Sequence, residues 1–371
     1  MKRWLLLLLL WLLIAYVGLF VQSPWETKFA NLPPPLRPFR PIFISLANHM
    51  LHGFGPSFDP KVIMDKARKT TGLQDFQDDT GTFALGLSKL CESLQQEANL
   101  NFVGKMMTRA QLDITVENRL KIAQATSSVP IPLTQPVFVV GMPRSGTTFL
   151  HNLLSLDDET FRAPRLWEIV DPLPVPETGT WLTSWRLFKS HMGTLVFQYL
   201  APNFASVHPV GSLQAEECMP ILSLSMLSFQ FYTMMNVPGY NDWLMPRSQM
   251  EALLWHKRFL QAVTTKRQHQ RWLLKAPWHM NHLDELLTVY PDAKVIVPHR
   301  TPEGMLASLS SLHARLFAMT SDELDLTGLG NYTRQVWEQI LGKFMAARTQ
   351  LPPTKCSTCN LASCIGIPLA L

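Results

Sequence analysis

One short segment constrains this chain more than any other. Residues 136–140 read Pro-Val-Phe-Val-Val, an apolar run typical of a buried strand, and glycines follow at 141 and 146. Four residues between two glycines is the spacing of a Walker A loop, but Thr147 stands where a nucleoside triphosphatase needs lysine. The backbone N–H groups of such a loop, together with the N-terminus of the helix after it, bind anions.

The side chains of this loop narrow the kind of anion. Arg144, Ser145, Gly146, Thr147 and Thr148 offer one guanidinium and three hydroxyls in place of the usual lysine. We therefore expect a phosphate with less charge to neutralise than the γ-phosphate of ATP with its Mg²⁺. The alternative is a solvent-facing junction of strand, turn and helix that binds no ligand.

Strands and helices alternate further along the chain. Residues 272–277 read as a second buried strand and 293–298 as a third, with a helix expected over 279–290 between them and another over 303–318. This alternation indicates an α/β fold with a parallel sheet flanked by helices, whose ligands bind outside the carboxyl ends of the strands.

Two basic residues lie at those strand ends, and a serine follows on the next helix. Lys275 closes the second strand, Arg300 follows the third, and Ser308 lies on the helix after it. Together with the loop after the first strand, these groups should converge on one edge of the sheet. The sequence therefore predicts an anionic ligand at that edge.

The same residues resemble the sulfotransferases that use 3′-phosphoadenosine 5′-phosphosulfate (PAPS). Residues 143–148 are similar to the 5′-phosphosulfate loop of that family, and Arg300 with Ser308 eight positions later is similar to its 3′-phosphate pair. Residues 274–277, Leu-Lys-Ala-Pro, resemble the branch that includes the tyrosylprotein sulfotransferases. Flanking patterns at 163–168 are shared with bacterial homologues, which points to a membrane-anchored branch related to both, and the resemblance covers roughly residues 55–345.

The resemblance implies transfer of a sulfuryl group from PAPS to a hydroxyl acceptor, which would be a glycan, a tyrosine or a lipid. It places Arg144, Ser145, Gly146, Thr147, Thr148, Arg300 and Ser308 at the cofactor. Lys275 and the backbone amides of the loop would hold the charge that develops on the leaving phosphate, because positioning and charge stabilisation dominate this type of transfer. No metal is expected, since the transferred group carries less charge than a γ-phosphate.

A general base must take the proton of the acceptor hydroxyl, and the sequence leaves three candidates. Glu168 is favoured, because related sulfotransferases of the tyrosylprotein type carry a catalytic glutamate in this segment. Glu217, in the pair Glu216-Glu217, would either contact the acceptor or hold a structural ion pair. His208 has a suitable ordinary pKa, although nothing in the sequence ties it to the site.

Composition limits the size of the core and the kinds of partner. With 371 residues, of which 47% are hydrophobic, the chain can bury one full core. A net charge of +5 fits anionic ligands but argues against a nucleic-acid partner. His279 and His282 are three residues apart with no third ligand in sight, so we expect packing rather than metal binding.

The N-terminus predicts a membrane anchor. Residues 4–21 contain no charge and are long enough to span a bilayer, after a basic cytosolic tip at 1–3 and before a Pro-rich stem at 22–42. We expect a single-pass type II protein, in the Golgi, whose catalytic domain faces the lumen. The sequon at Asn331 is compatible with that location.

Between the stem and the loop, residues 43–130 are expected to form a helical cap on the α/β domain of residues 131–348. Its helices are predicted at 43–52, 60–70, 81–98 and 108–124. The third of these should bury Phe83, Leu85, Leu87, Leu90 and Leu94. The tail at 349–371 is atypical for the resemblance, since it carries three of the five cysteines where further cofactor-binding segments are expected; a truncated isoform is one explanation.

The aromatic-rich stretch 181–245 lies between the two halves of the expected cofactor site. Its residues 221–235 are too short and too polar for a second membrane span, so a buried helix is predicted there. The stretch is either ordinary core or the wall of the acceptor cleft.

Two other classes of protein stay open. A kinase-like nucleotide enzyme is disfavoured by the missing Walker lysine. A catalytically inactive, membrane-anchored binding protein remains compatible with the unusual tail.

Overall fold

The computed structural model describes residues 50–51, 54–125, 131–174, 181–200, 210–264, 270–300, 302–321, 323–350 and 356–360. The predicted tip, anchor and stem, most of the predicted helix at 43–52, and His208 lie outside these residues. Within the described parts, no helix is both long and apolar enough to cross a membrane.

The centre of the fold is a parallel sheet of five described strands in the order β2-β3-β1-β4-β5. The strands are β1 (Val137–Val139), β2 (Phe161–Arg162), β3 (Arg271–Lys275), β4 (Lys294–His299) and β5 (Cys356–Asn360). β1 lies between β3 and β4, with Val139 opposite Lys275 on one side and Ile296 on the other. The predicted parallel sheet is confirmed, and its register brings the loop after β1 beside the end of β3.

Helices surround this sheet. The α-helices are α3 (Pro60–Thr71), α4 (Thr82–Gln96), α5 (Phe102–Ala125), α6 (Thr147–Leu154), α7 (Leu166–Val170), α8 (Trp181–Leu200), α9 (Met219–Leu222), α10 (Gln230–Met234), α11 (Pro238–Leu244), α12 (Met250–Val263), α13 (Leu283–Val289), α14 (Pro302–Thr320) and α15 (Leu326–Arg348). Two 3₁₀ helices accompany them, η2 (Ser223–Ser225) and η3 (Pro277–His282).

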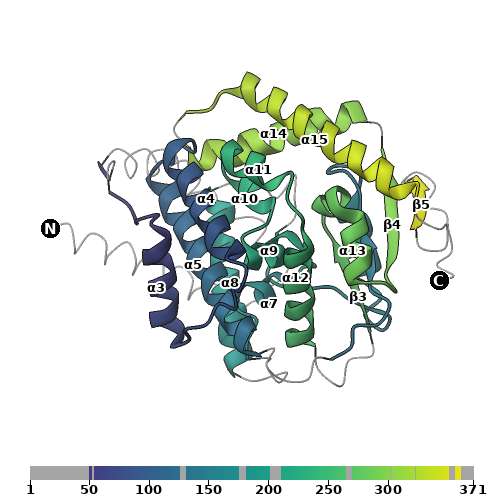
Figure 1. Ribbon diagram of the computed structural model, residues 1–371, viewed down its shortest axis with the longest axis horizontal. Helices are drawn as coiled ribbons and strands as arrows, with labels where there is room; N and C mark the ends of the chain where they lie inside the picture. Colours follow the sequence, from purple (N-terminus) through teal and green to yellow (C-terminus); the bar gives the residue numbers. More distant parts are fainter. Residues whose placement is uncertain are drawn as a thin grey trace. The chain divides into compact units, whose positions relative to one another are not determined.

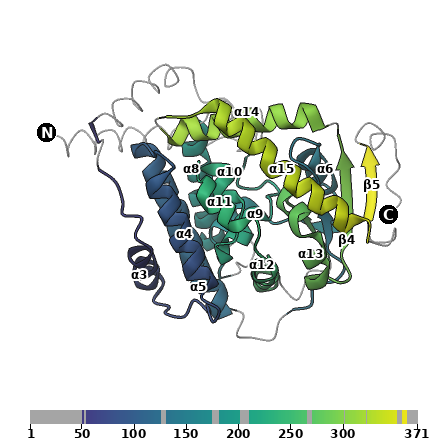
Figure 2. The ribbon, with the colours of Figure 1, turned by 45° about the horizontal axis from the view of Figure 1, so that its top comes forward.

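The N-terminal helices α3, α4 and α5 lie away from the strands, with α9 to α13 between the two groups (Figure 1). The long helix α14 starts beside β4 and reaches α5, which both views show (Figure 2). At that contact a Cβ atom on Gly104 would lie 2.0 Å from the carbonyl oxygen of Thr320, so only glycine lets the two helices approach so closely. One hydrophobic core runs from α3 through α12 to β1 and α15, so the helical cap and the α/β part share a single interior.

Three local predictions need correction. Leu85 is 46% exposed, because it lies on the outer face of α4 while Phe83, Leu87, Leu90 and Leu94 are buried. The helix expected at 221–235 is broken into α9, η2 and α10. Met226 adopts a left-handed φ of 57°, and the hydroxyls of Ser225 and Ser228 donate to the carbonyls of Leu222 and Met219.

The third correction concerns the helix expected at 279–290, which begins as the 3₁₀ helix η3 and becomes α-helical only at α13. The tail also contributes structure, since β5 pairs with β4 at the edge of the sheet (Figure 2).

Candidate active site

The loop between β1 and α6 is wound tightly enough to present its backbone N–H groups. Arg144 and Gly146 both have positive φ, at 67° and 91°. A Cβ atom on Gly141 would lie 3.2 Å from both Ser145 Oγ and Thr147 Cγ2, which explains glycine at that position. Alternating backbone conformations of this kind create anion-binding concavities, and the first N–H groups of α6 have no acceptor within the helix.

Ser145 shapes this loop from inside. Its hydroxyl donates to the carbonyl oxygen of Met142 at 2.7 Å, its N–H donates to the same oxygen at 3.2 Å, and its side chain is buried. Ser145 therefore closes the turn, whereas Gly146, Thr147 and Thr148 line the cavity next to it.

Three of the predicted cofactor residues meet beside that cavity, and two of them, Arg144 and Arg300, line it. Arg144 Nε donates to Ser308 Oγ at 2.9 Å, and Arg300 Nη1 donates to the carbonyl oxygen of Arg144 at 3.0 Å. These residues come from the loop, from the segment after β4 and from α14. The structure thus gathers two guanidinium groups and a hydroxyl, which suits a bound phosphate.

Lys275 lies on the other side of the loop, at the carboxyl end of β3, and is only 1% exposed. Its Nζ forms an ion pair with Glu217 Oε1 and donates to Thr148 Oγ1 at 3.2 Å. The N–H of Cys218 donates to the carbonyl oxygen of Lys275 at 2.8 Å, which ties the segment of Glu217 to the strand. The loop, β3 and the Glu216-Glu217 segment are therefore one connected unit.

Two buried histidines lie close to this ion pair. Burial, together with the positive charge of Lys275, lowers the pKa of His151 to about 4. Burial lowers the pKa of His279 to about 3, against a smaller opposing effect of Glu217. Both rings are therefore neutral near pH 7, so neither adds positive charge beside Lys275.

Glu168 is engaged elsewhere. Its Oε1 accepts a hydrogen bond from Arg162 Nη2 at 2.7 Å, and its Oε2 accepts one from the N–H of Arg165 at 3.0 Å, which caps the start of α7. Glu168 is not among the residues that line the cavity, whereas Glu216 and Glu217 are. The geometry therefore favours the second sequence candidate, Glu217, over the first; His208 lies outside the described residues.

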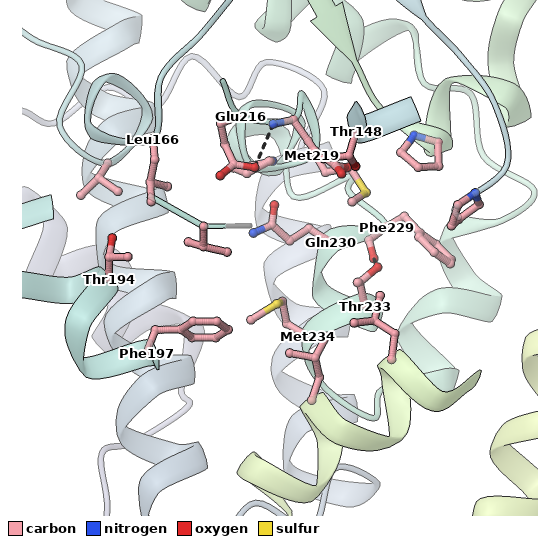
Figure 3. A pocket seen from close by; sticks show the side chains of 18 of the residues that line it. Thr148, Leu166, Thr194, Phe197, Glu216, Met219, Phe229, Gln230, Thr233 and Met234 are labelled. Carbon is pink, nitrogen blue, oxygen red and sulfur yellow. Dashed lines mark hydrogen bonds between the residues drawn. The ribbon is translucent and has the colours of Figure 1, made fainter. Parts of the chain in front are cut away.

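The cavity has a volume of about 910 Å³ and extends from the loop between α5, α8, α10 and α14. Figure 3 shows Thr148 and Glu216 at one end, with Phe197 and Met234 toward the other, and the amide of Gln230 extending into the space between them. Within the described residues, no group of three or more His, Cys, Asp or Glu side chains could hold a metal ion.

The sequence indicated the part of this cavity that comes from the aromatic stretch but did not indicate the wall from α14. Phe197 and Phe229 of the aromatic stretch line it, whereas Phe231 and Tyr240 are core residues. The wall from α14 consists of Leu309, Leu312, His313 and Leu316. The helical spacing of the leucines was a usable signal of an apolar face, but it could not say that this face borders a cavity.

Comparison with known proteins identifies the class of this arrangement. Residues 136–359 match the Sulfotransferase family, a span that begins just before β1 and ends within β5. The chain therefore belongs to the sulfotransferase family of enzymes.

Individual relatives come from mycobacteria. Over 244 residues the chain is 28% identical to the omega-hydroxy-beta-dihydromenaquinone-9 sulfotransferase Stf3 of Mycobacterium bovis and to Stf3 of Mycobacterium tuberculosis. The match covers 63% of this chain and spans only 59% of the length of those curated relatives.

Two solved structures are also similar. The crystal structure of sulfotransferase STF1 from Mycobacterium tuberculosis H37Rv has a TM-score of 0.74 and 29% identity, covering 83% of this chain and 86% of the other. Sulfotransferase STF9 from Mycobacterium avium has a TM-score of 0.68 and 21% identity, covering 81% and 78%, and shows the shared fold alone.

Proposed function

We propose that this protein transfers a sulfuryl group from PAPS to the hydroxyl of an acceptor. The observation that carries the proposal is that Gly146, Thr148, Arg144 and Arg300 line a single cavity, while Lys275 and Ser308 contact these residues from behind, at Thr148 and Arg144. Bound PAPS would supply the sulfuryl group and a phosphate leaving group. The positive-φ loop, the N-terminus of α6 and the two guanidinium groups are the donor set that a doubly phosphorylated nucleotide requires.

The roles of the residues follow from their positions. The N–H groups at Gly146–Thr148 would hold the 5′-phosphosulfate end, and Arg144, Arg300 and Ser308 would hold the 3′-phosphate. Ser145 keeps the loop closed through its bonds to Met142. Lys275 lies within reach of Thr148 and would stabilise the charge on the leaving phosphate oxygen.

Glu217 is the general base that we propose in place of Glu168. Its carboxylate lines the cavity and contacts Lys275, so a proton acceptor and a charge stabiliser lie side by side. The acceptor oxygen forms a bond to sulfur as the bond from sulfur to the phosphate oxygen breaks, and the hydroxyl proton passes to the carboxylate. The products are a sulfate ester and adenosine 3′,5′-bisphosphate.

Thermal stability with ligands tests the cofactor assignment. Adenosine 3′,5′-bisphosphate should raise the Tm of the purified protein, because a ligand that binds only the folded state stabilises it. ATP with Mg²⁺ should raise it much less. Stabilisation by MgATP alone would point to the kinase-like alternative, and the absence of any shift with the bisphosphate would support an inactive binding protein.

A matched pair of serine variants tests the 3′-phosphate assignment. Ser308→Ala should weaken binding of the bisphosphate by roughly 1.5–3 kcal/mol and leave binding of 5′-AMP unchanged, because only the bisphosphate presents a group to this hydroxyl. Ser310→Ala, two residues further along the same helix, is the control, because the hydroxyl that accepts from Arg144 is that of Ser308. Equal losses for both nucleotides would remove Ser308 from 3′-phosphate recognition.

For the acceptor, the curated relatives are named for a hydroxylated dihydromenaquinone, which supports a lipid among the three acceptor types expected from the sequence.

We also propose a membrane anchor at residues 4–21 and a lumenal catalytic domain, supported by the uncharged run there. Asn331 is exposed on the first turns of α15, although Thr333 of its sequon is buried. Carbonate extraction of membranes and glycosidase digestion of the full chain test both.

A further inference from the structure

Beyond the loop, the cavity is walled mainly by apolar side chains. They come from six helices, α5, α7, α8, α9, α10 and α14, and from the segment before α10, namely Ile114, Leu166, Val170, Phe197, Met219, Phe229, Met234, Leu309, Leu312 and Leu316. Figure 3 shows Leu166, Phe197 and Met234 around the open space on the side away from Thr148 and Glu216. We call this part the apolar arm of the cavity.

The charged residues that border the apolar arm balance one another. Asp171 accepts hydrogen bonds from Lys121 at 3.1 Å and from Lys189 at 2.6 Å, and Glu117 completes two acidic and two basic groups. An anionic ligand would find no excess of positive charge here. The arm therefore favours an uncharged molecule.

Neutral hydrogen-bonding groups interrupt the apolar walls. His313 is 1% exposed and lines the arm, and neither ring nitrogen has a hydrogen-bond partner in the part of the chain that the structure describes. The Oε1 atom of Gln230 likewise has no described partner, and its amide extends into the cavity (Figure 3). Burial lowers the pKa of His313 to about 4, so near pH 7 its ring is neutral and offers one donor and one acceptor.

We propose that the acceptor is an uncharged, elongated apolar alcohol, such as a polyprenyl alcohol, whose hydroxyl reaches Glu217 and the loop while its chain fills the apolar arm. The inference rests on the proposed sulfotransferase function and selects one acceptor class within it. A polar substituent along the chain would find a partner at His313 or Gln230. The cavity volume of about 910 Å³ is at the upper end of the range for a single small-molecule site, which leaves room for a chain beside a nucleotide.

The other two acceptor types fit these walls poorly. A glycan would set many hydroxyl groups against leucine, methionine and phenylalanine side chains, where each would lose its hydrogen bonds to water without a replacement. A peptide would need partners for its backbone N–H and C=O groups, and the apolar arm offers few.

The first test measures sulfation directly. The full-length protein is incubated with ³⁵S-labelled PAPS and with geraniol, farnesol or geranylgeraniol, which differ by one isoprene unit each, or with a neutral oligosaccharide or a tyrosine peptide. Only the alcohols should be sulfated. Their KM should fall by roughly tenfold or more per isoprene unit until the arm is full, because each buried methylene improves affinity about three- to fourfold.

A glycine in the arm provides a sharper test. Gly193 on α8 lines the cavity, and a Cβ atom there would meet nothing within 4 Å, so the backbone at this position accepts a side chain, and we expect a large one to narrow the arm. Gly193→Trp should lower kcat/KM for farnesol by at least a hundredfold and leave the Tm shift with adenosine 3′,5′-bisphosphate unchanged. Gly342→Trp is the matched control, because Gly342 is equally unobstructed on α15 and does not line the cavity.

The outcomes separate the two levels of the argument. Binding of the bisphosphate with sulfation of the glycan or the peptide alone, or with no sulfation of any alcohol, would overturn the acceptor class and leave the cofactor site standing. Full activity of Gly193→Trp on farnesol would also overturn it. Failure to bind the bisphosphate would overturn the proposed function itself.

Discussion

Arg119 and Lys275 are two of the cations that are buried almost completely in the described part of the chain, and their partners differ in kind. Arg119, on α5, is 0% exposed, and Lys275, at the end of β3, is 1% exposed. Burying a charge is costly unless it is paired and hydrogen-bonded, so each must be compensated. How each is compensated separates a structural cation from a functional one.

Arg119 is held mainly by main-chain oxygens and an aromatic ring, with the carboxylate of Glu251 further away, at 3.9 Å. Its guanidinium donates to the carbonyls of Phe76 at 2.8 Å, Gln77 at 2.9 Å and Leu224 at 3.1 Å, and it lies 3.4 Å from the ring centre of Trp255. These partners join α5 to the segment before α4 and to η2. They cannot be exchanged for a ligand without displacing the backbone, so Arg119 stabilises the packing of the helices.

Lys275 is held by side chains at the cavity. Glu217 and Thr148 both line the cavity and both contact its ammonium group. A ligand that enters the loop could therefore take over part of this coordination while the backbone stays in place. The comparison predicts that changes around Lys275 affect catalysis first, and changes around Arg119 affect stability first.

The largest effect is expected at Glu217. Glu217→Gln keeps the shape of the side chain and removes its basicity, so kcat should fall by roughly 10²–10⁴. Steady-state kinetics with labelled PAPS and farnesol measures this, and the Tm shift with adenosine 3′,5′-bisphosphate shows whether the variant is still folded and binds the nucleotide.

The control for Glu217→Gln is Glu168→Gln. Because Glu168 caps α7 and pairs with Arg162, its amide variant should lose stability by about 1 kcal/mol and keep kcat within a few-fold of the unmodified protein. If Glu168→Gln abolished turnover while Glu217→Gln retained it, the base would be the residue that the sequence favoured.

The next effect in size concerns Arg119. Arg119→Leu leaves two buried carbonyl oxygens and one part-buried carbonyl oxygen without their donor, each buried one at a cost of about 1–3 kcal/mol, so the free energy of unfolding should fall by at least about 2 kcal/mol. Urea denaturation followed by circular dichroism measures the change. The fraction that remains folded should bind adenosine 3′,5′-bisphosphate with unchanged affinity.

Arg258→Leu is the matched control for Arg119→Leu. Arg258 lies over the ring of the same Trp255 at 4.8 Å, but it donates to the side chain of Gln77 and is only partly buried. Its loss should cost about 1 kcal/mol or less. Equal losses for the two variants would mean that the aromatic ring, and not the carbonyls, accounts for the role of Arg119.

The contrast also shows what sequence alone could reveal. Three strands were predictable, namely the one before Gly141, the one that ends at Lys275 and the one before Arg300. A buried strand has a local run of apolar residues, and the loop after it has local glycines, so both can be recognised in the sequence. Since parallel strands share one edge, the convergence of these three segments followed from the pattern.

Contacts between residues far apart in sequence could not be predicted from such local patterns. Glu217 and Lys275 form an ion pair although they are 58 positions apart in the sequence. Arg144 donates a hydrogen bond to Ser308, which is 164 positions away. β5 lacks an apolar run and exists because β4 offers it a parallel edge. The cap that Glu168 forms on α7 was also not predicted, because the sequence does not distinguish a capping glutamate from a catalytic one.

A further loss of activity is expected at Lys275. If its ammonium group interacts more strongly with the leaving phosphate in the transition state than in the ground state, Lys275→Met should lower kcat by about 10²–10³ with a smaller change in PAPS affinity. A loss confined to PAPS affinity would assign Lys275 to binding alone.

Stability supplies the control for Lys275→Met. Removing one partner leaves the other buried and unpaired, so Lys275→Met and Glu217→Gln should each destabilise the protein, and the double variant should be more stable than the sum of the single losses implies. Strictly additive losses would show that the two side chains do not act as a pair.

The smallest effect distinguishes the surroundings of the two cations by pH. His151 and His279 have pKa values of about 4 and 3 in the folded protein, against about 6.5 in an unfolded chain. Between these values the unfolded chain binds more protons, so each ring should make stability fall as the pH is lowered from about 6.5 toward 4, by up to about 1.4 kcal/mol per pH unit. Above pH 6.5 neither ring should make stability depend on pH.

The two cations should differ in their effect on this pH dependence. Because the charge of Lys275 helps to lower the pKa of His151, Lys275→Met should show a shallower loss of stability between pH 6.5 and pH 4, whereas Arg119→Leu should keep the slope of the unmodified protein. Urea denaturation at half-unit steps between pH 7.5 and pH 4.5 measures the slopes. An equal slope in all three proteins would mean that burial alone keeps His151 neutral, and that the charge at Lys275 is already balanced by Glu217.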